Sequence, residues 1–201
     1  SLSRWGKPRP ADVRARPPYA GYRPSPGARV RWPDAFGTRF TLCVDTEEEF
    51  DWTAPLSRRA RAVTATAALP DAHLVGLGEG PEREHLEAHA ARLGVQERVS
   101  FLGVRPWTDI GAYYRLAELF LFASDTETQG LVLLEAMSAG LPVVALAEMG
   151  TQDILGARRG ALVPENNPYA FALELARVLG DSGLRSRLSV EARVYAREWS
   201  S

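Results

Sequence analysis

The chain has 201 residues, 45% of them apolar, and its 24 basic and 25 acidic side chains leave a formal charge of −1. No overall charge therefore draws it to nucleic acid or to an anionic membrane. Its single cysteine, Cys43, excludes an intramolecular disulfide and a cysteine-based zinc cage. No apolar run approaches the roughly 18 residues of a membrane span, and the first residues lack the apolar core of a secretion signal. We therefore expect a cytoplasmic protein.

Residues 1–33 form a basic, proline-rich stretch that differs from the rest of the chain. They hold 7 of the 14 prolines and 8 of the 24 basic residues, against one acid, Asp12. Such a stretch cannot bury enough apolar surface to offset the entropy lost on ordering, so we expect a disordered arm. A solvated tail is favoured over contact with nucleic acid or acidic lipid. Peripheral membrane association remains an alternative, and nucleic acid is not an expected partner.

Residues 34–70 form the next segment. Its apolar, β-prone residues 39–44 predict a buried strand, and residues 57–69 predict a helix that Pro70 stops. Between them lies an acidic run with five acids in the seven positions from Asp45 to Asp51, and with no base.

Residues 71–201 alternate between strand-like and helix-like segments. Strands are expected at 73–76, 98–102, 119–123, 143–146 and 161–163, and helices at 81–93, 108–117, 130–139, 167–179 and 184–199. We expect Pro81 in the first turn of its helix, Gly94 at the end of that helix, and Thr108 as a cap. The alternation predicts an α/β domain with a single Rossmann-like, doubly wound parallel sheet. Ligands of such sheets bind beyond the carboxyl ends of the strands.

The strongest chemical signal is a pair of carboxylates, Glu127 and Glu135, eight positions apart. The first follows the strand expected at 119–123, and the second lies on the helix that begins near Gly130. The free N–H groups of Gly130 and Leu131, together with the helix dipole, would attract a phosphate. Because Glu135 lies in an apolar helix, we expect its carboxylate to have a partner. Spacing alone leaves open that these acids only stabilise their helix.

Four ordered blocks carry a family resemblance over residues 71–200: LVGLGEGPE (74–82), RVSFLGV (98–104), AELFLFASDTETQGLVLLEAMSAGLPVVA (117–145) and GALVPENNP (160–168). This stretch resembles the C-terminal, donor-binding domain of the family 4 glycosyltransferases, which have the GT-B fold. The pair Glu127 and Glu135 matches the E-x7-E signature of that family.

The resemblance implies a hexosyl transfer from a nucleotide-diphosphate sugar that retains the anomeric configuration and needs neither a metal nor a cofactor. It implies that Glu127 is catalytic at the donor sugar and that Glu135 binds the ribose hydroxyls. Gly130 and Leu131 would offer N–H groups to the diphosphate.

Further residues of the donor site follow from the same resemblance. Thr128 and Gln129 stand where many members have Gly-Phe, and Gly78 with Glu79 would form a turn close to the nucleotide. The acceptor, a carbohydrate or a lipid, is not readable. A GT-B enzyme binds its acceptor mainly through a first domain that this chain lacks, so we expect a separate acceptor-binding domain.

Two other motifs, a glycine-rich stretch and a histidine pair, are not typical of the dinucleotide and zinc sites that they partly resemble. The glycine-rich stretch from Gly76 to Gly80 is a poor dinucleotide fingerprint, because its third glycine would fall on Pro81. His85 and His89 have a spacing that can bind zinc, but no third ligand is evident nearby. A solvated surface helix is the favoured interpretation, and we expect no metal site.

The segment RFTLCVDTEEEFDW resembles the opening motif of NodB-type polysaccharide deacetylases, over residues 31–70. That resemblance implies that Asp45 is a general base and that Glu47 lies near a metal. About 40 residues cannot build the barrel of such an enzyme, so deacetylation is not favoured. The resemblance to the glycosyltransferases implies an opening βα unit, with an arginine and a lysine that neutralise the diphosphate, and residues 71–200 lack it. We expect the strand at 39–44 and the helix at 57–69 to fill this vacant edge position, where the acidic run would replace those cations and weaken nucleotide-sugar binding. A non-catalytic nucleotide-sugar-binding module and a deacetylase remnant remain the alternatives.

Overall fold

The computed structural model describes residues 40–44, 61–124, 127, 129–148 and 150–199. Several predictions concern residues outside these ranges: the basic arm at 1–33, the acidic run with Asp45 and Glu47, the site residue Thr128, and the first turn of the helix expected from residue 57. The boundary expected near Pro70 also remains a prediction. The described residues confirm the expected α/β fold with a parallel sheet.

Six parallel strands form the sheet in the order β3-β2-β1-β4-β5-β6. They are β1 Phe40–Val44, β2 His73–Leu77, β3 Val99–Phe101, β4 Leu119–Phe122, β5 Val143–Ala145 and β6 Ala161–Leu162. This is the strand order of a Rossmann sheet. Strands β2 and β3 lie on one side of β1 and the last three strands on its other side, so the switch point lies between β1 and β4. The carboxyl ends of β1 and β4 therefore flank the point where ligands bind in this architecture.

The position of β1 corrects one expectation. Residues 39–44 were expected to join the parallel sheet at a vacant edge. Phe40–Val44 does join the sheet, but inside it, between β2 and β4. Leu42 is in register with Val75 on one side and with Phe120 on the other. Strand order depends on pairing between segments far apart in the chain, and local sequence patterns carry no information about it.

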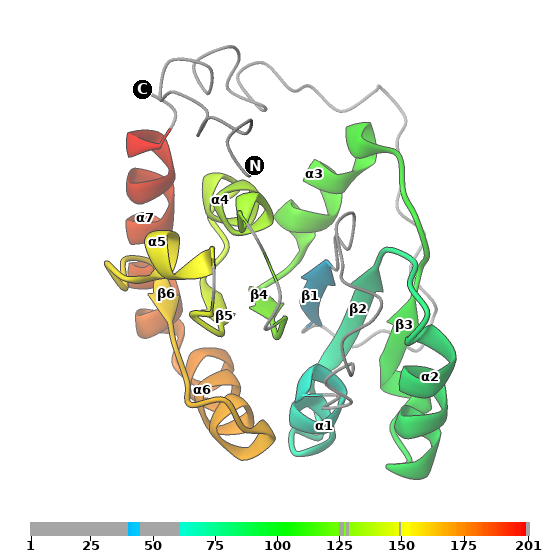
Figure 1. Cartoon of the computed structure of the whole chain (residues 1–201). Coiled ribbons are helices and arrows are strands. Elements are labelled where there is room, and N and C mark those ends of the chain that lie inside the picture. The colour runs from blue at the N-terminus through cyan, green and yellow to red at the C-terminus, as the bar shows by residue number, and fades with distance from the viewer. Residues whose placement is uncertain (1–39, 45–60, 125–126, 128, 149, 200–201) are drawn as a thin grey trace, which may run out of the picture.

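The described residues also form seven α-helices and one short 3-10 helix. They are α1 Arg61–Ala67, α2 Arg83–Arg92, η2 Gln96–Arg98, α3 Trp107–Leu116, α4 Leu131–Ser138, α5 Thr151–Leu155, α6 Pro168–Gly180 and α7 Ser182–Glu198, of which α6 and α7 follow the last strand. Figure 1 shows α7 along the β6 side of the sheet and α2 along the β3 side.

Both faces of the sheet are covered, as the alternation along β4 shows. Phe120 and Phe122 pack into a core that includes residues of α3, α4, α5 and the end of α7. Leu119 and Leu121 point to the other face, where they join residues of α1, α6 and the start of α7. All four side chains are buried. A strand that is apolar at every position is what a doubly covered parallel sheet requires.

Arg98 ties α1 to the sheet. Its guanidinium Nη1 donates to the carbonyl oxygens of Thr66, Leu69 and Ala72, at and just beyond the end of α1. The carbonyls of Thr66 and Leu69 also accept backbone N–H groups, from Leu69 and Ala72, so the arginine reinforces a turn that already has its own hydrogen bonds. Because Arg98 adjoins β3, the arginine fixes the end of α1 against the same sheet that carries the downstream strands. The described part of the helix expected at 57–69 thus packs as part of this domain.

The helix starts differ from the predictions by one or two residues. Thr108 does not cap its helix: α3 begins at Trp107, with Pro106 at the capping position. Pro81 precedes α2, which begins at Arg83, whereas Gly94 ends this helix as expected with a positive φ of 68°. The helix α7 begins at Ser182, because the carboxylate of Asp181 accepts from the N–H of Leu184 at 2.9 Å and caps it.

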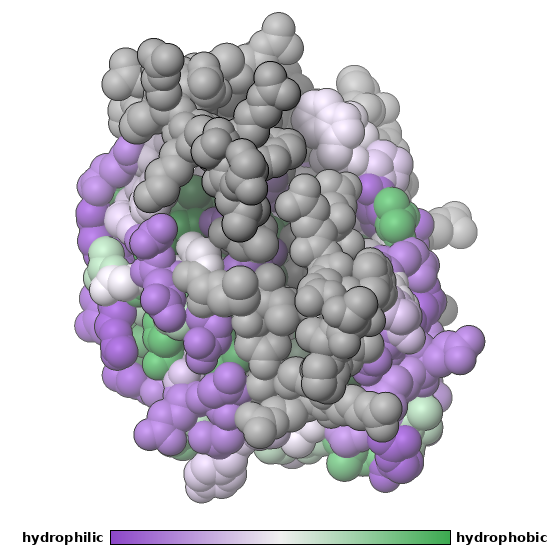
Figure 2. Space-filling view, in the orientation of Figure 1, coloured by the Kyte–Doolittle hydropathy of each residue, from purple (hydrophilic) through white to green (hydrophobic). Residues whose placement is uncertain are grey.

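The described helices include none that combines the length and the apolar character needed to cross a bilayer. In Figure 2, hydrophilic side chains dominate the described surface on the side shown, with apolar residues between them.

Candidate functional site

The carboxyl ends of the parallel strands share one edge of the sheet, and the predicted site residues lie on loops at this edge. Gly78 and Glu79 follow β2, while Glu127 and Gln129 follow β4 and lead into α4. Glu135 lies on the second turn of α4. The topology therefore brings the β2 and β4 loops to the edge where β1 and β4 flank the switch point.

Glu127 is held by the backbone of its own loop. Its Oε1 accepts the N–H of Gln129 at 3.0 Å and the N–H of Gly130 at 2.9 Å. Its carbonyl oxygen accepts the N–H of Gly150, just before α5, at 3.1 Å. The carboxylate thus lies at the start of α4, where the helix dipole favours a negative charge.

Gly130 shapes this helix start. It has a φ of 69°, a left-handed conformation that side chains other than glycine adopt only at a cost. A Cβ on Gly130 would lie 3.2–3.3 Å from Thr151 Cγ2, Ile154 Cδ1 and Leu133 Cδ1. The start of α4 therefore packs directly under α5. The Gly130 N–H predicted to face a diphosphate donates to Glu127 in this structure, whereas the N–H of the half-exposed Leu131 finds no acceptor among the described residues.

The helix α5 forms a wall of the site that the sequence analysis missed. Its first residue, Thr151, is buried, and its Oγ1 accepts the N–H of Glu148 at 2.9 Å and lies within hydrogen-bond distance of the carbonyl oxygens of Leu146 and Glu148. This hydroxyl fixes the turn that leads from β5 into α5. A helix of five residues between two glycines has too few positions to show a periodicity, so no pattern pointed to it.

Glu135 has the partner that its apolar surroundings required. The hydroxyl of Tyr114, on α3, donates to Glu135 Oε2 at 3.2 Å. The ring of Tyr114 is 1% exposed and meets Phe120 edge-on, with the ring centroids 5.8 Å apart. A buried aromatic residue packed on β4 therefore positions the carboxylate. No local pattern pointed to Tyr114, because its role depends on contact between two helices.

Gly78 and Glu79 stabilise the loop that follows β2. The N–H of Gly78 donates to the carbonyl of Gly103 at 3.1 Å, which joins the loops after β2 and β3. Glu79 Oε1 accepts from Arg83 Nη1 at 2.7 Å, and a Cβ on Gly103 would lie 2.6 Å from the same oxygen. The structure thus gives both residues a role in loop geometry, and their predicted role in donor binding stays a prediction.

The histidine pair on α2 serves the packing of that helix. His89 Nδ1 lies 3.0 Å from Arg92 Nη2, which can only donate, so Nδ1 accepts and Nε2 carries the proton toward Thr64 Oγ1 at 2.9 Å. Both ring nitrogens of His89 are therefore occupied. Burial, the positive charge of Arg92 and that of His85 lower the pKa of His89. The described residues contain no group of three or more His, Cys, Asp or Glu side chains arranged to hold a metal ion.

The sequence profile of the family "Glycosyl transferases group 1" matches residues 58–195, which is more than half of the chain. The D-inositol 3-phosphate glycosyltransferase of Salinispora tropica is 42% identical over 125 residues, which cover 61% of this chain and 26% of that protein. The chain thus corresponds to about a quarter of the length of that relative.

Solved glycosyltransferase structures superpose on this fold. The C-terminal domain of the group 1 glycosyltransferase LpcC from Francisella tularensis superposes with a TM-score of 0.64 at 20% identity, covering 79% of this chain and 85% of that domain. HepE of Anabaena, solved with UDP and glucose, superposes with a TM-score of 0.66 at 21% identity, covering 82% of this chain and 45% of HepE. These neighbours share half of a GT-B fold with the chain.

The expected resemblance of residues 31–70 to polysaccharide deacetylases finds no support in these comparisons. Residues 58–70 of that segment lie within the family match instead, in agreement with the contacts that Arg98 makes to the end of α1.

Proposed function

The chain belongs to the group 1 glycosyl transferase family, and we propose that it is the donor-binding domain of a retaining glycosyltransferase. In this proposal it binds a nucleoside-diphosphate sugar for hexosyl transfer to a hydroxyl acceptor. The arrangement around α4 carries the proposal: Glu127 at its first amide groups and Glu135 on its second turn, both at the switch-point edge of the sheet. The binding of UDP and glucose by HepE, a neighbour of the same fold, agrees with such a ligand.

The start of α4 is the proposed diphosphate site. The Leu131 N–H and the helix dipole attract the phosphate groups. The carboxylate of Glu127 and a phosphate cannot share the Gly130 N–H, since both are anions that accept from it. We propose that the diphosphate takes this N–H and that the released Glu127 turns to the donor sugar, near the reacting carbon.

Glu135 is the proposed partner of the ribose hydroxyls. A carboxylate accepts two hydroxyl hydrogen bonds well, and such charge-assisted bonds are stronger than neutral ones. The Tyr114 hydroxyl holds Oε2, so the carboxylate is oriented before the ligand arrives. This preorganisation reduces the entropy lost on binding.

The proposed reaction needs little covalent chemistry from the protein. The bond between the anomeric carbon and the phosphate oxygen breaks, the acceptor oxygen bonds to the same face of that carbon, and the acceptor proton passes to the departing diphosphate. The residues of this chain position the donor sugar and stabilise the charge of the departing diphosphate.

The acceptor is proposed to bind to a second domain. The chain corresponds to about a quarter of its curated relatives, and the described residues form one sheet with its covering helices. The acidic run from Asp45 follows β1, whose carboxyl end lies beside that of β4. We propose that the five acids of this run oppose a diphosphate, which weakens donor binding by the chain alone.

A calorimetric titration with UDP, GDP and their sugar conjugates tests this function. We expect saturable binding of one nucleotide class, weakened about 10- to 100-fold by Glu135→Ala, because a charge-assisted hydrogen bond is lost. Glu84→Ala is the matched control, since Glu84 is an exposed acid on α2. Equal affinities of the parent chain and Glu135→Ala would contradict the assignment.

A second measurement separates a catalytic domain from a non-catalytic binding module. A catalytic domain should release free sugar slowly from its bound donor, since water can replace the acceptor. A module that only binds the nucleotide sugar should release none, even when calorimetry shows the donor bound.

A further inference from the structure

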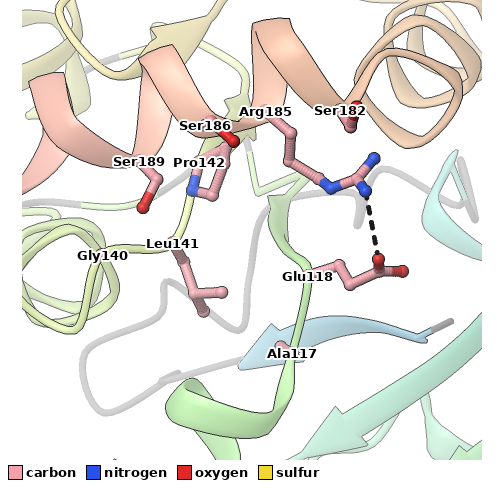
Figure 3. A pocket seen from close by; sticks show the side chains of 9 residues that line it. All are labelled: Ala117, Glu118, Gly140, Leu141, Pro142, Ser182, Arg185, Ser186 and Ser189. Atoms are coloured by element: carbon pink, nitrogen blue, oxygen red, sulfur yellow. Dashed lines mark ion pairs between the residues drawn. The ribbon is translucent and has the colours of Figure 1, made fainter. Parts of the chain in front are cut away.

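The helix α7 is anchored at its start beside the amino end of β4. Arg185 Nη1 donates to the carbonyl oxygens of Val178 at 2.9 Å and Leu179 at 2.8 Å. Figure 3 shows the same guanidinium reaching toward Glu118, the residue before β4, where its Nη2 lies 3.4 Å from Oε1. The 17 residues of α7 are about 25 Å long, so its other end can reach the opposite edge of the sheet, where the candidate site lies.

The second half of α7 holds the segment that connects α5 to β6. The N–H of Gly160 donates to Glu191 Oε2 at 3.2 Å, and a Cβ on Gly160 would overlap the backbone of Ala192. Arg159 Nη1 and Nη2 donate to the two carboxylate oxygens of Glu198 at 2.6 Å and 2.8 Å. The segment after α5 is therefore fixed against a helix that is itself anchored at its start.

Tyr195 reaches from α7 to α5. Its ring is 7% exposed, with the guanidinium of Arg159 5.0 Å from its centroid and the ring of Trp199 edge-on to it. Its hydroxyl donates to the carbonyl oxygen of Ile154 at 2.9 Å. The last carbonyls of a helix lack intrahelical partners, and this hydroxyl supplies a donor to one of them. The end of α5 is thus bonded to α7.

Ile154 connects this bond to the candidate site. Its carbonyl oxygen accepts from Tyr195, while its Cδ1 would lie 3.3 Å from a Cβ on Gly130, at the start of α4. Just before α5, the N–H of Gly150 donates to the carbonyl oxygen of Glu127 at 3.1 Å. Because packed interiors transmit displacements, a shift of α5 moves both the start of α4 and the loop that carries Glu127.

We propose that Tyr195 is a positioning residue for the diphosphate half of the donor site. Its hydroxyl fixes α5, and α5 sets the place of the N–H groups of Gly130 and Leu131. This inference rests on the proposed function of the α4 start. Tyr195 acts through Ile154 on the diphosphate groups, whereas Tyr114 orients Glu135 and so acts on the ribose.

A comparison of UDP with inorganic pyrophosphate tests this role. Tyr195→Phe keeps the ring and removes the hydroxyl. In titrations of the full chain followed by amide chemical shifts, we expect it to bind both ligands about two- to fivefold more weakly than the parent chain, because both use the start of α4. Tyr114→Phe should weaken the binding of UDP alone, since pyrophosphate has no ribose. Without ligand, the amide shifts of Gly130 and Leu131 should differ between Tyr195→Phe and the parent chain.

Asn167→Ala is the control for a loss of stability alone. Asn167 Oδ1 accepts the N–H of Ala170 at 2.8 Å and caps α6, which packs on the face of the sheet opposite to α4. We expect this variant to unfold at a lower urea concentration and to bind UDP and pyrophosphate as the parent chain does. An equal loss of affinity in Asn167→Ala and Tyr195→Phe would mean that lower stability explains both, and would overturn the proposal.

The failure of this inference is distinguishable from the failure of the proposed function. A parent chain that binds neither UDP nor pyrophosphate would contradict the proposed function. A parent chain that binds both ligands, with Tyr195→Phe binding them equally tightly, would overturn the positioning role alone. Unchanged amide shifts of Gly130 and Leu131 in ligand-free Tyr195→Phe would also overturn it, whether or not the chain binds a nucleotide.

Discussion

The hydroxyl of Tyr114 donates to Glu135 Oε2 at 3.2 Å, and this contact links a buried ring on α3 to the carboxylate proposed to bind ribose. Because the ring packs on Phe120 of β4, the orientation of the carboxylate depends on the core of the domain. The first prediction follows from this dependence.

Tyr114→Phe keeps the ring packing and removes the hydroxyl. We expect a loss of about 0.5–1.5 kcal/mol in the free energy of unfolding, the usual value of one hydrogen bond. We also expect weaker UDP binding, because Glu135 is no longer oriented. Urea denaturation and calorimetry measure the two effects.

Tyr195→Phe is the control for this variant. Its hydroxyl donates to the carbonyl of Ile154 at 2.9 Å, away from Glu135. We expect a similar loss of stability and a smaller loss of UDP affinity than in Tyr114→Phe, because Ile154 packs at the start of α4 and the Tyr195 hydroxyl does not orient Glu135. A Tyr114→Phe chain that binds UDP as tightly as Tyr195→Phe would contradict the positioning role.

Gly130→Ala tests the packing at the start of α4. The left-handed φ of 69° costs about 1–2 kcal/mol for alanine, and the new Cβ meets Thr151 Cγ2 and Ile154 Cδ1 at 3.2–3.3 Å. We expect a total destabilisation of about 2–4 kcal/mol in urea denaturation.

Gly94→Ala isolates the backbone part of this effect. Gly94 has a φ of 68°, but a Cβ there would meet no atom within 4 Å. We expect this variant to cost only about 1–2 kcal/mol. Equal losses at the two glycines would mean that the contact of α4 with α5 adds nothing to stability.

Glu127→Ala separates nucleotide binding from transfer. The variant frees the Gln129 and Gly130 N–H groups, so we expect UDP to bind as tightly as in the parent chain, or up to about tenfold more tightly. Release of sugar from the bound donor should be lost, since Glu127 acts at the sugar. Calorimetry and a donor-hydrolysis assay measure the two quantities. A UDP affinity that falls with Glu127→Ala would contradict the proposed competition for the helix start.

His89 gives the domain a predictable pH dependence. Burial, Arg92 and His85 lower its pKa in the folded chain from the ordinary 6.5, so below that pH the unfolded chain binds more protons than the folded one. The contribution of His89 to stability is complete above pH 6.5 and is lost as the pH falls toward its folded pKa. Urea denaturation on both sides of this pH should show the loss, and His89→Gln should reduce it.

His85→Gln is the control for the pH experiment. His85 stacks on the ring of His89 with the centroids 6.5 Å apart, but among the described residues it makes no hydrogen bond. We expect this variant to keep most of the pH dependence, because the contacts of His89 with Thr64 and Arg92 remain. The interpretation fails if His89→Gln loses stability with acid as steeply as the parent chain.

The alternation of short apolar runs with amphipathic segments was sufficient to predict the parallel sheet. Strands such as Leu119–Phe122 are apolar at every position, which is recognisable without a partner. The predicted helices lie within two residues of their described bounds, since capping residues such as Asn167 and terminal glycines such as Gly140 mark them locally. The exception is the helix from residue 57, of which the structure describes Arg61–Ala67.

Features that depend on tertiary contacts could not be predicted from local sequence patterns. Local patterns could not place β1 between β2 and β4, because strand order is set by pairing across the chain. They also missed Tyr114, whose hydroxyl matters only through a residue 21 positions away. The pair Glu127 and Glu135 was recognisable from its spacing and its family resemblance, whereas the bond from the Gly130 N–H to Glu127 required the folded loop.

A crystal structure of the chain with UDP tests the central claim most directly. We predict that the diphosphate lies at the start of α4, accepting from the N–H groups of Gly130 and Leu131, with the ribose hydroxyls on Glu135. UDP bound elsewhere, or at α4 with Glu135 turned away from the ribose, would contradict the account.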